Sequence, residues 1–266
     1  MSSRPQTTRR AIRGIVSRDD AQLVIVDTPG LHRPRTLLGE RLNDLVRETF
    51  AEVDVIGFCL PANEKIGPGD KWIARELSQA RAPVVAGVTK TDTVSRDRVA
   101  QHLMDVMALG DWADVVPVSS VKDVQIDVLT DVLIKHLPTG PALYPEGAVT
   151  DEPEDVMIAE LIREAALEGV RDELPHSIAV VIEEMIEPGT EEATRELLEI
   201  RAQLFVERDS QKGIIIGKGG ERLREVGATA RHGIERLLGR RVHLDLHIKV
   251  AKEWQRDPKQ LGRLGF

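Results

Sequence analysis

Asp27 and Gly30 are the residues whose types and spacing point most directly to chemistry. They follow a strand-forming run at residues 22–26 and are separated by Thr28 and Pro29. An apolar run that ends in an acidic residue and a Pro-Gly turn is typical of a buried strand in an α/β sheet. Beyond the carboxyl end of such a strand, a carboxylate can hold nucleotide-bound Mg²⁺ through water, and a glycine N–H can reach a γ-phosphate. Taken alone, these residues fit a strand ending in an ordinary Asx turn equally well.

Two further apolar runs end in polar residues. The run at 84–88 leads into a Thr-Lys-Thr-Asp tetrad, and the run at 115–118 leads into a pair of serines. These polar residues are Thr89, Lys90, Thr91, Asp92, Ser119 and Ser120. Together with the Asp-Thr-Pro-Gly motif, they resemble the motifs of Ras-like GTPases in order and spacing. Each motif is weak alone, but the three in this order predict a GTP-binding domain.

A second candidate site lies near the other end of the chain, in the loop Gly217-Lys218-Gly219-Gly220. Glycines around a basic residue at a helix N-terminus let the backbone approach a phosphodiester, because no Cβ is in the way. The loop resembles the GxxG loop of KH domains, which clamp about four single-stranded nucleotides. The alternative is a glycine-rich turn between two helices.

The elements that position these sites follow two different patterns. Strands are predicted at 11–17, 22–26, 53–60, 84–88 and 115–118, and helices within 31–50 and at 70–80, 95–109 and 124–137. This alternation predicts βαβ units and a mainly parallel sheet. After a Pro- and Gly-rich stretch come a helix at 154–170 and strands at 177–186 and 196–207. They are followed by a short helix or turn at 212–216, a helix at 221–238 and a strand at 242–250. The order α-β-β-α-α-β is that of a type II KH domain.

The composition is that of a globular protein, and the charge is distributed unevenly along the chain. The chain has 266 residues with 30% charged and 41% hydrophobic side chains, and a formal net charge of −8. Residues 151–200 carry 16 acidic and 3 basic side chains, whereas residues 201–266 carry 15 basic and 8 acidic ones. The basic surplus around the glycine-rich loop is therefore hidden by its acidic neighbour. The only cysteine, Cys59, excludes an intramolecular disulfide and is expected to be a small core residue in a reducing compartment.

A Ras-like domain followed by one type II KH domain resembles the Era family of bacterial ribosome-assembly GTPases over essentially the whole chain. Residues 4–9 resemble its first switch, and the stretch from Asp27 to Leu31 resembles its Asp-Thr-Pro-Gly-Leu motif. The related family with two GTPase domains is disfavoured, because one set of guanine motifs is present. The resemblance implies three parts: a GTPase domain at 1–138, a linker at 139–153 and an RNA-binding KH domain at 154–266.

The resemblance also implies roles for individual residues. Asp92 would accept hydrogen bonds from guanine, Lys90 would lie along the base, and Ser119 with the Ser120 backbone N–H would complete the base pocket. Thr89 stands where an Asn is usual, so its hold on the base edge is expected to be weaker. Thr7 or Thr8 would reach Mg²⁺ in the GTP state, with Asp27 contacting the ion through water.

One expected motif is absent from the 266 residues. The family's GxxxxGK[ST] phosphate loop, with the strand before it and the helix after it, would precede Arg4. That strand would lie in the sheet between the strands at 22–26 and 53–60, so two strand edges are expected to lack partners. The sequence is compatible with a start assigned too far downstream, which we favour, or with a truncated copy. GTP and Mg²⁺ binding by these residues alone is therefore in doubt.

The resemblance implies a GTP-regulated factor for assembly of the small (30S) ribosomal subunit that binds 16S rRNA near its 3′ end. Leu31, which cannot orient a water molecule, implies slow, partner-dependent GTP hydrolysis. The family context also implies a cytoplasmic monomer, with peripheral association at the inner face of the cell membrane. Two alternatives remain from the sequence. One is a non-enzymatic RNA-binding protein with a relic GTPase scaffold, and the other is an interaction scaffold with neither activity.

Overall fold

The computed structural model describes residues 9–32, 34–168 and 177–266. The described chain forms two compact units. The N-terminal unit comprises residues 10–32 and 42–150, and the C-terminal unit comprises residue 9 with residues 34–41, 151–168 and 177–266. No helix within these ranges is long and apolar enough to cross a membrane.

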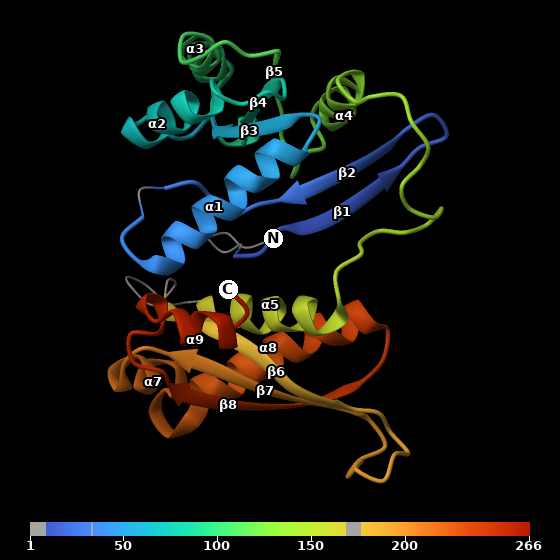
Figure 1. Ribbon diagram of the computed structural model, residues 1–266, viewed down its shortest axis with the longest axis vertical. Coiled ribbons are helices and arrows are strands. Elements are labelled where there is room, and N and C mark those ends of the chain that lie inside the picture. Colours follow the sequence, from blue (N-terminus) through green and yellow to red (C-terminus); the bar gives the residue numbers. More distant parts are fainter. Residues whose placement is uncertain (1–8, 33, 169–176) are drawn as a thin grey trace. The chain divides into compact units, whose positions relative to one another are not determined.

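The N-terminal unit alternates strands and helices as predicted (Figure 1). Its strands are β1 (Ile12–Ser17), β2 (Gln22–Asp27), β3 (Ile56–Pro61), β4 (Val84–Thr89) and β5 (Asp114–Pro117). Its helices are α2 (Pro68–Leu77), the 3₁₀ turn η1 (Thr91–Thr93), α3 (Arg96–Met107), α4 (Ile126–Lys135) and most of α1 (Leu37–Glu52). Strands β3, β4 and β5 form a parallel sheet in that order, and β1 and β2 form an antiparallel hairpin. The predicted α/β class is confirmed.

Strand β4 is buried on both faces, which explains its continuous apolar sequence. Val84, Ala86 and Val88 belong to a core that includes Val106 of α3. Val85 points to the opposite face, where it packs with Val116 and residues of α4. The carboxyl end of β4 is thereby held rigidly, and that end leads into the Thr-Lys-Thr-Asp tetrad.

Strand β3 departs from its predicted burial. Ile56, Phe58 and Leu60 are buried, whereas Gly57 and Cys59 on the alternate face are exposed. The prediction that Cys59 is a core residue is wrong, because its side chain lies on the exposed face of β3. Strand β3 is paired with β4 alone, and β2 is paired with β1 alone, among the described residues. The edges of β2 and β3 that were expected to lack partners are therefore unpaired within the described chain.

The last residues of the N-terminal unit are anchored to the β1–β2 hairpin. The Gln22 side-chain carbonyl accepts hydrogen bonds from the backbone N–H groups of Leu143 and Tyr144, at 2.8 and 2.9 Å. Farther along, the Ile15 N–H donates to the Val149 carbonyl at 2.9 Å. The first part of the stretch that was predicted as a linker is thus a hydrogen-bonded strap on this unit.

His102 of α3 is a buried polar residue with an unusual environment. Its side chain is 1% exposed, and neither ring nitrogen has a hydrogen-bond partner among the described residues. Burial lowers the pKa of His102 below its usual value, and the charge of Arg98 lowers it further. The imidazole therefore remains neutral in the folded chain at a pH where it is protonated in the unfolded chain.

Replacing His102 by leucine is expected to stabilise the chain and to reduce its sensitivity to mild acid. The folded-state pKa lies below the unfolded value, so stability falls as the pH drops through about 6.5 toward the folded pKa. Removing two unsatisfied nitrogens should also raise stability by about 1–3 kcal/mol. Melting temperatures at pH 7.5 and 5.5 measure both effects, with His232→Gln on the solvent-exposed surface as the control. A lower melting temperature for His102→Leu at both pH values would contradict this assignment.

The C-terminal unit has the predicted α-β-β-α-α-β order (Figure 1). It contains α5 (Glu154–Leu167), β6 (Ala179–Ile186), β7 (Leu198–Val206), α7 (Asp209–Ile216), η2 (Lys218–Gly220), α8 (Glu221–Leu238), β8 (Val242–Val250), η3 (Trp254–Arg256) and α9 (Pro258–Arg263). Strand β7 pairs antiparallel with β6 and parallel with β8. Ile158 and Ile162 of α5, Ile200 of β7 and Ile234 of α8 are fully buried in one core. The predicted KH class is confirmed.

The segment after β8, for which no structure was predicted, completes this unit. Trp254 is fully buried, and its indole N–H donates to the Ser177 carbonyl at 3.1 Å. The ring of Phe266 stacks on Trp254 with centroids 5.6 Å apart. Arg9 lies with its guanidinium 5.6 Å from the Trp254 ring centroid and donates to the Ile178 carbonyl at 2.6 Å. Burial, with repulsion from Arg163, lowers the pKa of Arg9 to about 9.

Candidate functional site

Asp92 and Ser119 meet at the carboxyl ends of the adjacent strands β4 and β5. The Ser119 hydroxyl donates a 2.6 Å hydrogen bond to Asp92 Oδ1. Ser119 is 1% exposed, and its oxygen also accepts from the Lys122 backbone N–H at 3.2 Å. The Asp92 side chain is therefore held in one position, with its other carboxylate oxygen available to a ligand. An acceptor of this kind suits the N1–H and N2–H donors of guanine.

The tetrad containing Asp92 is fixed by the hydroxyls of Thr91 within it and of Thr93 just after it. Lys90 adopts a left-handed conformation with φ 55°, and the hydroxyl of Thr93 caps its carbonyl at 2.7 Å. The Thr91 hydroxyl donates to the carbonyl of Val118 at 3.0 Å, which joins the tetrad to the end of β5. Thr89 ends β4, and its carbonyl accepts from the Ala62 N–H at 2.8 Å. Threonine at positions 91 and 93 was not predicted to have this structural role.

The serine loop closes on itself next to Asp92. Ser119 and Val124 exchange two backbone hydrogen bonds of 3.1 and 2.9 Å, and Asp123 and Gln125 both have positive φ values of 52° and 55°. Ser120 is an exposed residue of this loop and follows Ser119, the hydrogen-bond partner of Asp92.

Asp27 ends β2, with Thr28, Pro29, Gly30 and Leu31 following it in an irregular loop. Pro29 is buried, whereas Asp27 and Gly30 are exposed, and a Cβ on Gly30 would meet no atom within 4 Å. The open backbone at Gly30 suits the close approach of a phosphate.

Asn43 of α1, which sequence reasoning missed, holds this loop in place. Its side-chain nitrogen donates to the His32 carbonyl at 2.7 Å, and its side-chain oxygen accepts from the His32 N–H at 3.4 Å. Asn43 is almost fully buried. A single asparagine in an amphipathic helix gives no sequence signal for such a role.

Asp27 fits a site for Mg²⁺ that travels with a nucleotide. Mg²⁺ usually keeps several waters and takes one or two protein carboxylates together with substrate phosphates. No cluster of three or more His, Cys, Asp or Glu side chains that could hold a metal occurs in the part of the chain that the structure describes. A single exposed carboxylate at the end of β2 agrees with that mode of binding. Thr7 and Thr8, the predicted switch residues, lie outside the described residues.

The glycine-rich loop of the C-terminal unit has a backbone that requires glycine. Gly217, Gly219 and Gly220 have φ values of 71°, 60° and 76°. A Cβ at Gly217 would lie 2.7 Å from the Cβ of Arg222, whereas one at Gly219 would meet no atom within 4 Å. Gly217 is thus required for packing, and Gly219 keeps the outer surface of the loop open. Lys218 and Gly219 are both exposed.

Two arginines of α8 hold the loop against the rest of the unit. Arg222 Nη2 donates to the carbonyls of Ala166 and Glu168 at the end of α5, at 3.2 and 2.7 Å. Arg224 Nη2 donates to the Gly219 carbonyl at 3.1 Å. Arg222 therefore acts as a C-cap for α5, and Arg224 orients the loop backbone.

Ile214 adds an apolar surface beside the loop. Its side chain is 49% exposed in α7, three residues before Gly217. An apolar side chain next to a loop that approaches phosphates can contact an unstacked base. Three isoleucines precede the loop at 214–216, and the sequence alone does not distinguish the exposed Ile214 from the buried Ile215.

Family comparisons match both units. The model of the KH domain family matches residues 173–255, and that of the 50S ribosome-binding GTPase family matches residues 1–90. The chain is 65% identical over 271 residues to GTPase Era of Streptomyces coelicolor, covering 100% of this chain and 86% of the relative. It is also 65% identical over 269 residues to GTPase Era of Mycobacterium avium, covering 100% of this chain and 89% of the relative.

Solved structures agree with these relatives. A crystal structure of Era with MgGDPNP and nucleotides 1506–1542 of 16S ribosomal RNA superposes with a TM-score of 0.91 at 34% identity. A variant of Aquifex aeolicus Era bound to GDP·AlF₄⁻ gives the same TM-score and identity. Both comparisons cover 100% of this chain and 89% of the other. The two units, their motifs and these matches together show that the chain belongs to the Era family of GTPases.

Proposed function

We propose that this protein is a GTP-regulated RNA-binding factor in the assembly of the 30S ribosomal subunit, and that its KH loop binds 16S rRNA near the 3′ end. The observation that carries the proposal is the open, glycine-dependent loop at 217–220, in a fold shared with an Era that was solved with that RNA segment. In this role, Lys218 neutralises a phosphate, and Gly219 lets the RNA backbone approach the loop.

The N-terminal unit supplies the nucleotide-dependent part of this function. The carboxylate of Asp92, positioned by Ser119, selects guanine, while Lys90 lies along the base and the Ser120 N–H completes the pocket. Asp27 and one of Thr7 and Thr8 would hold Mg²⁺, and the backbone of Gly30 would allow a phosphate to approach. The ion, when bound, would supply positive charge that offsets the charge of the nucleotide phosphates. The relatives' name as GTPases argues against a scaffold without nucleotide chemistry.

We also propose that the protein is a monomer in the cytoplasm and that it associates peripherally with the inner face of the cell membrane. The support for this is family membership rather than any contact within the two units.

RNA selectivity tests the proposal. The chain is expected to bind an RNA with the sequence of nucleotides 1506–1542 of 16S rRNA at least about tenfold more tightly than a scrambled RNA of equal length and composition. Fluorescence anisotropy at fixed salt provides the measurement, because both RNAs carry the same phosphate charge. Equal affinity for the two RNAs would reduce the function to non-specific binding and contradict the assigned target.

A further inference from the structure

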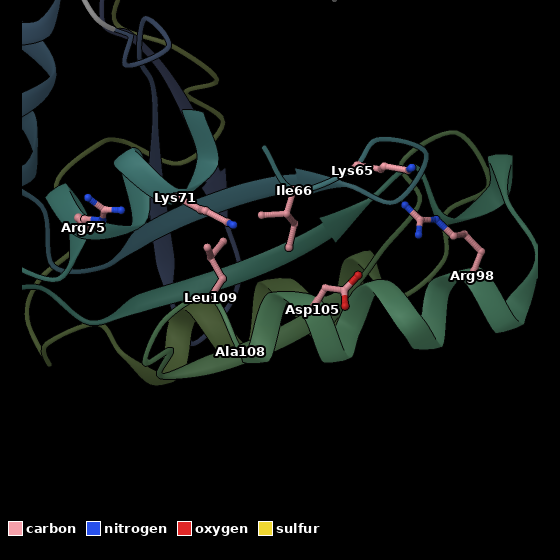
Figure 2. Close-up of a pocket in the computed structure, with 8 residues that line it drawn as sticks. All are labelled: Lys65, Ile66, Lys71, Arg75, Arg98, Asp105, Ala108 and Leu109. Carbon is pink, nitrogen blue, oxygen red and sulfur yellow. The ribbon is translucent and has the colours of Figure 1, made fainter. Parts of the chain in front are cut away.

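The N-terminal unit has a groove that none of the predicted nucleotide residues line. It is a cavity of about 700 Å³ along helices α2 and α3 (Figure 2). Its volume falls within the range of small-molecule and cofactor sites, roughly 300–1,000 Å³. The residues that line it are Lys65, Ile66, Lys71, Arg75, Arg98, Asp105, Ala108 and Leu109.

Four of these residues are cationic and only Asp105 is anionic. The surrounding segment, residues 53–150, carries 9 Lys and Arg against 13 Asp and Glu, so a local excess of positive charge runs against its composition. Among the described residues, no carboxylate forms an ion pair with Lys65, Lys71 or Arg75. The Asp105 carboxylate accepts from the Gln101 amide at 3.0 Å instead. The groove therefore keeps three cations unneutralised.

The cations follow one another along the groove. Lys71 and Arg75 are four residues apart on α2, so they share one helix face. Figure 2 shows Arg75, Lys71 and Lys65 spaced along the α2 side, with Arg98 and Asp105 on α3. Arg98 is anchored, because its Nη2 donates to the Glu64 carbonyl at 3.0 Å. A row of cations matches the repeating charges of a strand better than it matches a single compact anion.

The floor of the groove is apolar. Ile66, Ala108 and Leu109 line it between the charged side chains. Ile66 and Leu109 are partly buried, and Ala108 is exposed. Lysines and arginines on an ordinary convex helix face would have no apolar surface between them. A cationic rim around an apolar floor can accommodate a sugar or base between two phosphates that contact the rim.

We propose that this groove is a second nucleic-acid contact, which binds the phosphates of an RNA strand and places one nucleoside on the apolar floor. Lys71 and Lys65 supply point charges, and the guanidinium groups of Arg75 and Arg98 supply fork-shaped donors that match phosphate oxygens. RNA is favoured over an acidic protein because the same chain carries a KH domain. The inference goes beyond the proposed function, which assigns RNA to the KH loop alone.

The test uses the full chain in a background where the KH loop is disabled by Lys218→Asp and Gly219→Asp. In that background we expect residual, salt-dependent binding of a labelled 20-nucleotide single-stranded RNA at about 50 mM salt. Lys71→Glu with Arg75→Glu should weaken it by about tenfold or more and lower the slope of log K against log salt by roughly 1.4. Arg81→Glu with Arg96→Glu makes the same charge change at exposed positions outside the groove and should alter affinity by less than about twofold.

Several results would overturn the proposal. They are an absence of residual RNA binding in the background chain, equal losses for the two variant pairs, or no loss for the groove pair. A groove pair that loses binding to a poly-glutamate peptide, but keeps binding to RNA, would assign the groove to an acidic protein instead. Failure of the KH-loop assignment can be told apart from failure of the groove proposal. In that case Lys218→Asp with Gly219→Asp alone would leave RNA affinity unchanged. Melting curves confirm that each variant is folded.

Discussion

Replacing Lys218 and Gly219 by aspartate in the full chain is expected to weaken binding of the 16S rRNA 3′ segment by about 100-fold or more. The change removes one cation and places two carboxylates where phosphates must approach, so attraction becomes repulsion. A Cβ at Gly219 meets no atom within 4 Å, and Lys218 is exposed. Aspartate also tolerates positive φ better than most residues, which limits the strain at φ 60°. The melting temperature should therefore change by no more than a few degrees.

A matched control distinguishes an effect of the loop position from a general effect of the added negative charge. Lys252→Asp with Gly239→Asp makes the same change in charge at an exposed lysine and at an exposed glycine with φ 65° and an open Cβ position. This pair should keep RNA affinity within about threefold of the parent. Anisotropy titrations and melting curves for both pairs give the comparison. If the loop pair binds RNA as well as the parent and melts at the same temperature, the loop is not the RNA contact.

The polypeptide of these 266 residues is expected to bind GTP with Mg²⁺ at least about 100-fold more weakly than GTPase Era of Streptomyces coelicolor. Phosphate loops supply the backbone N–H cradle, a lysine on the β- and γ-phosphates and a hydroxyl on Mg²⁺. No GxxxxGK[ST] motif occurs among the 266 residues, so in the proposed site Asp92 and Ser119 would hold only the base end of the ligand. The structure agrees, because β2 and β3 are not hydrogen-bonded to one another or to any other strand between them in the described ranges.

Titration of fluorescently labelled GTP against both proteins measures the difference, and the relative serves as the positive control. Labelled ATP provides the control for base selectivity, since residual binding through Asp92 should favour guanine. A submicromolar dissociation constant for the 266-residue polypeptide would show that other residues replace the phosphate cradle.

The fold was largely predictable because its signals are local. Apolar runs such as 84–88 are buried on both faces, and the Pro- and Gly-rich stretch after α4 separates two different element orders. The helix α9 was missed because it is short and begins at Pro258, in a region without a clear apolar period. Cys59 was placed wrongly because burial of a strand face depends on what packs over it, which the strand's own sequence does not contain.

The sites were predictable only where their residues are contiguous. Asp92 and Gly217–Gly220 stand in recognisable motifs, whereas Asn43 acts from a helix 11 residues away from the His32 that it holds. The cationic groove gave no signal, because Lys65, Lys71, Arg75 and Arg98 are spread over two helices and a loop. Their proximity results from the packing of α2 and α3 on one face of the sheet, which no local pattern encodes.

The exposed face of β3 gives this protein an internal chemical reporter. Cys59 is its only thiol, and it faces outward beside Gly57. The protein around Cys59 desolvates the thiol and raises its pKa, and the Asp27 carboxylate raises the pKa further. Alkylation of Cys59 is therefore slow at neutral pH and accelerates as the pH rises. A strand or helix that covers this face slows the reaction, so the alkylation rate reports whether this face of β3 is covered.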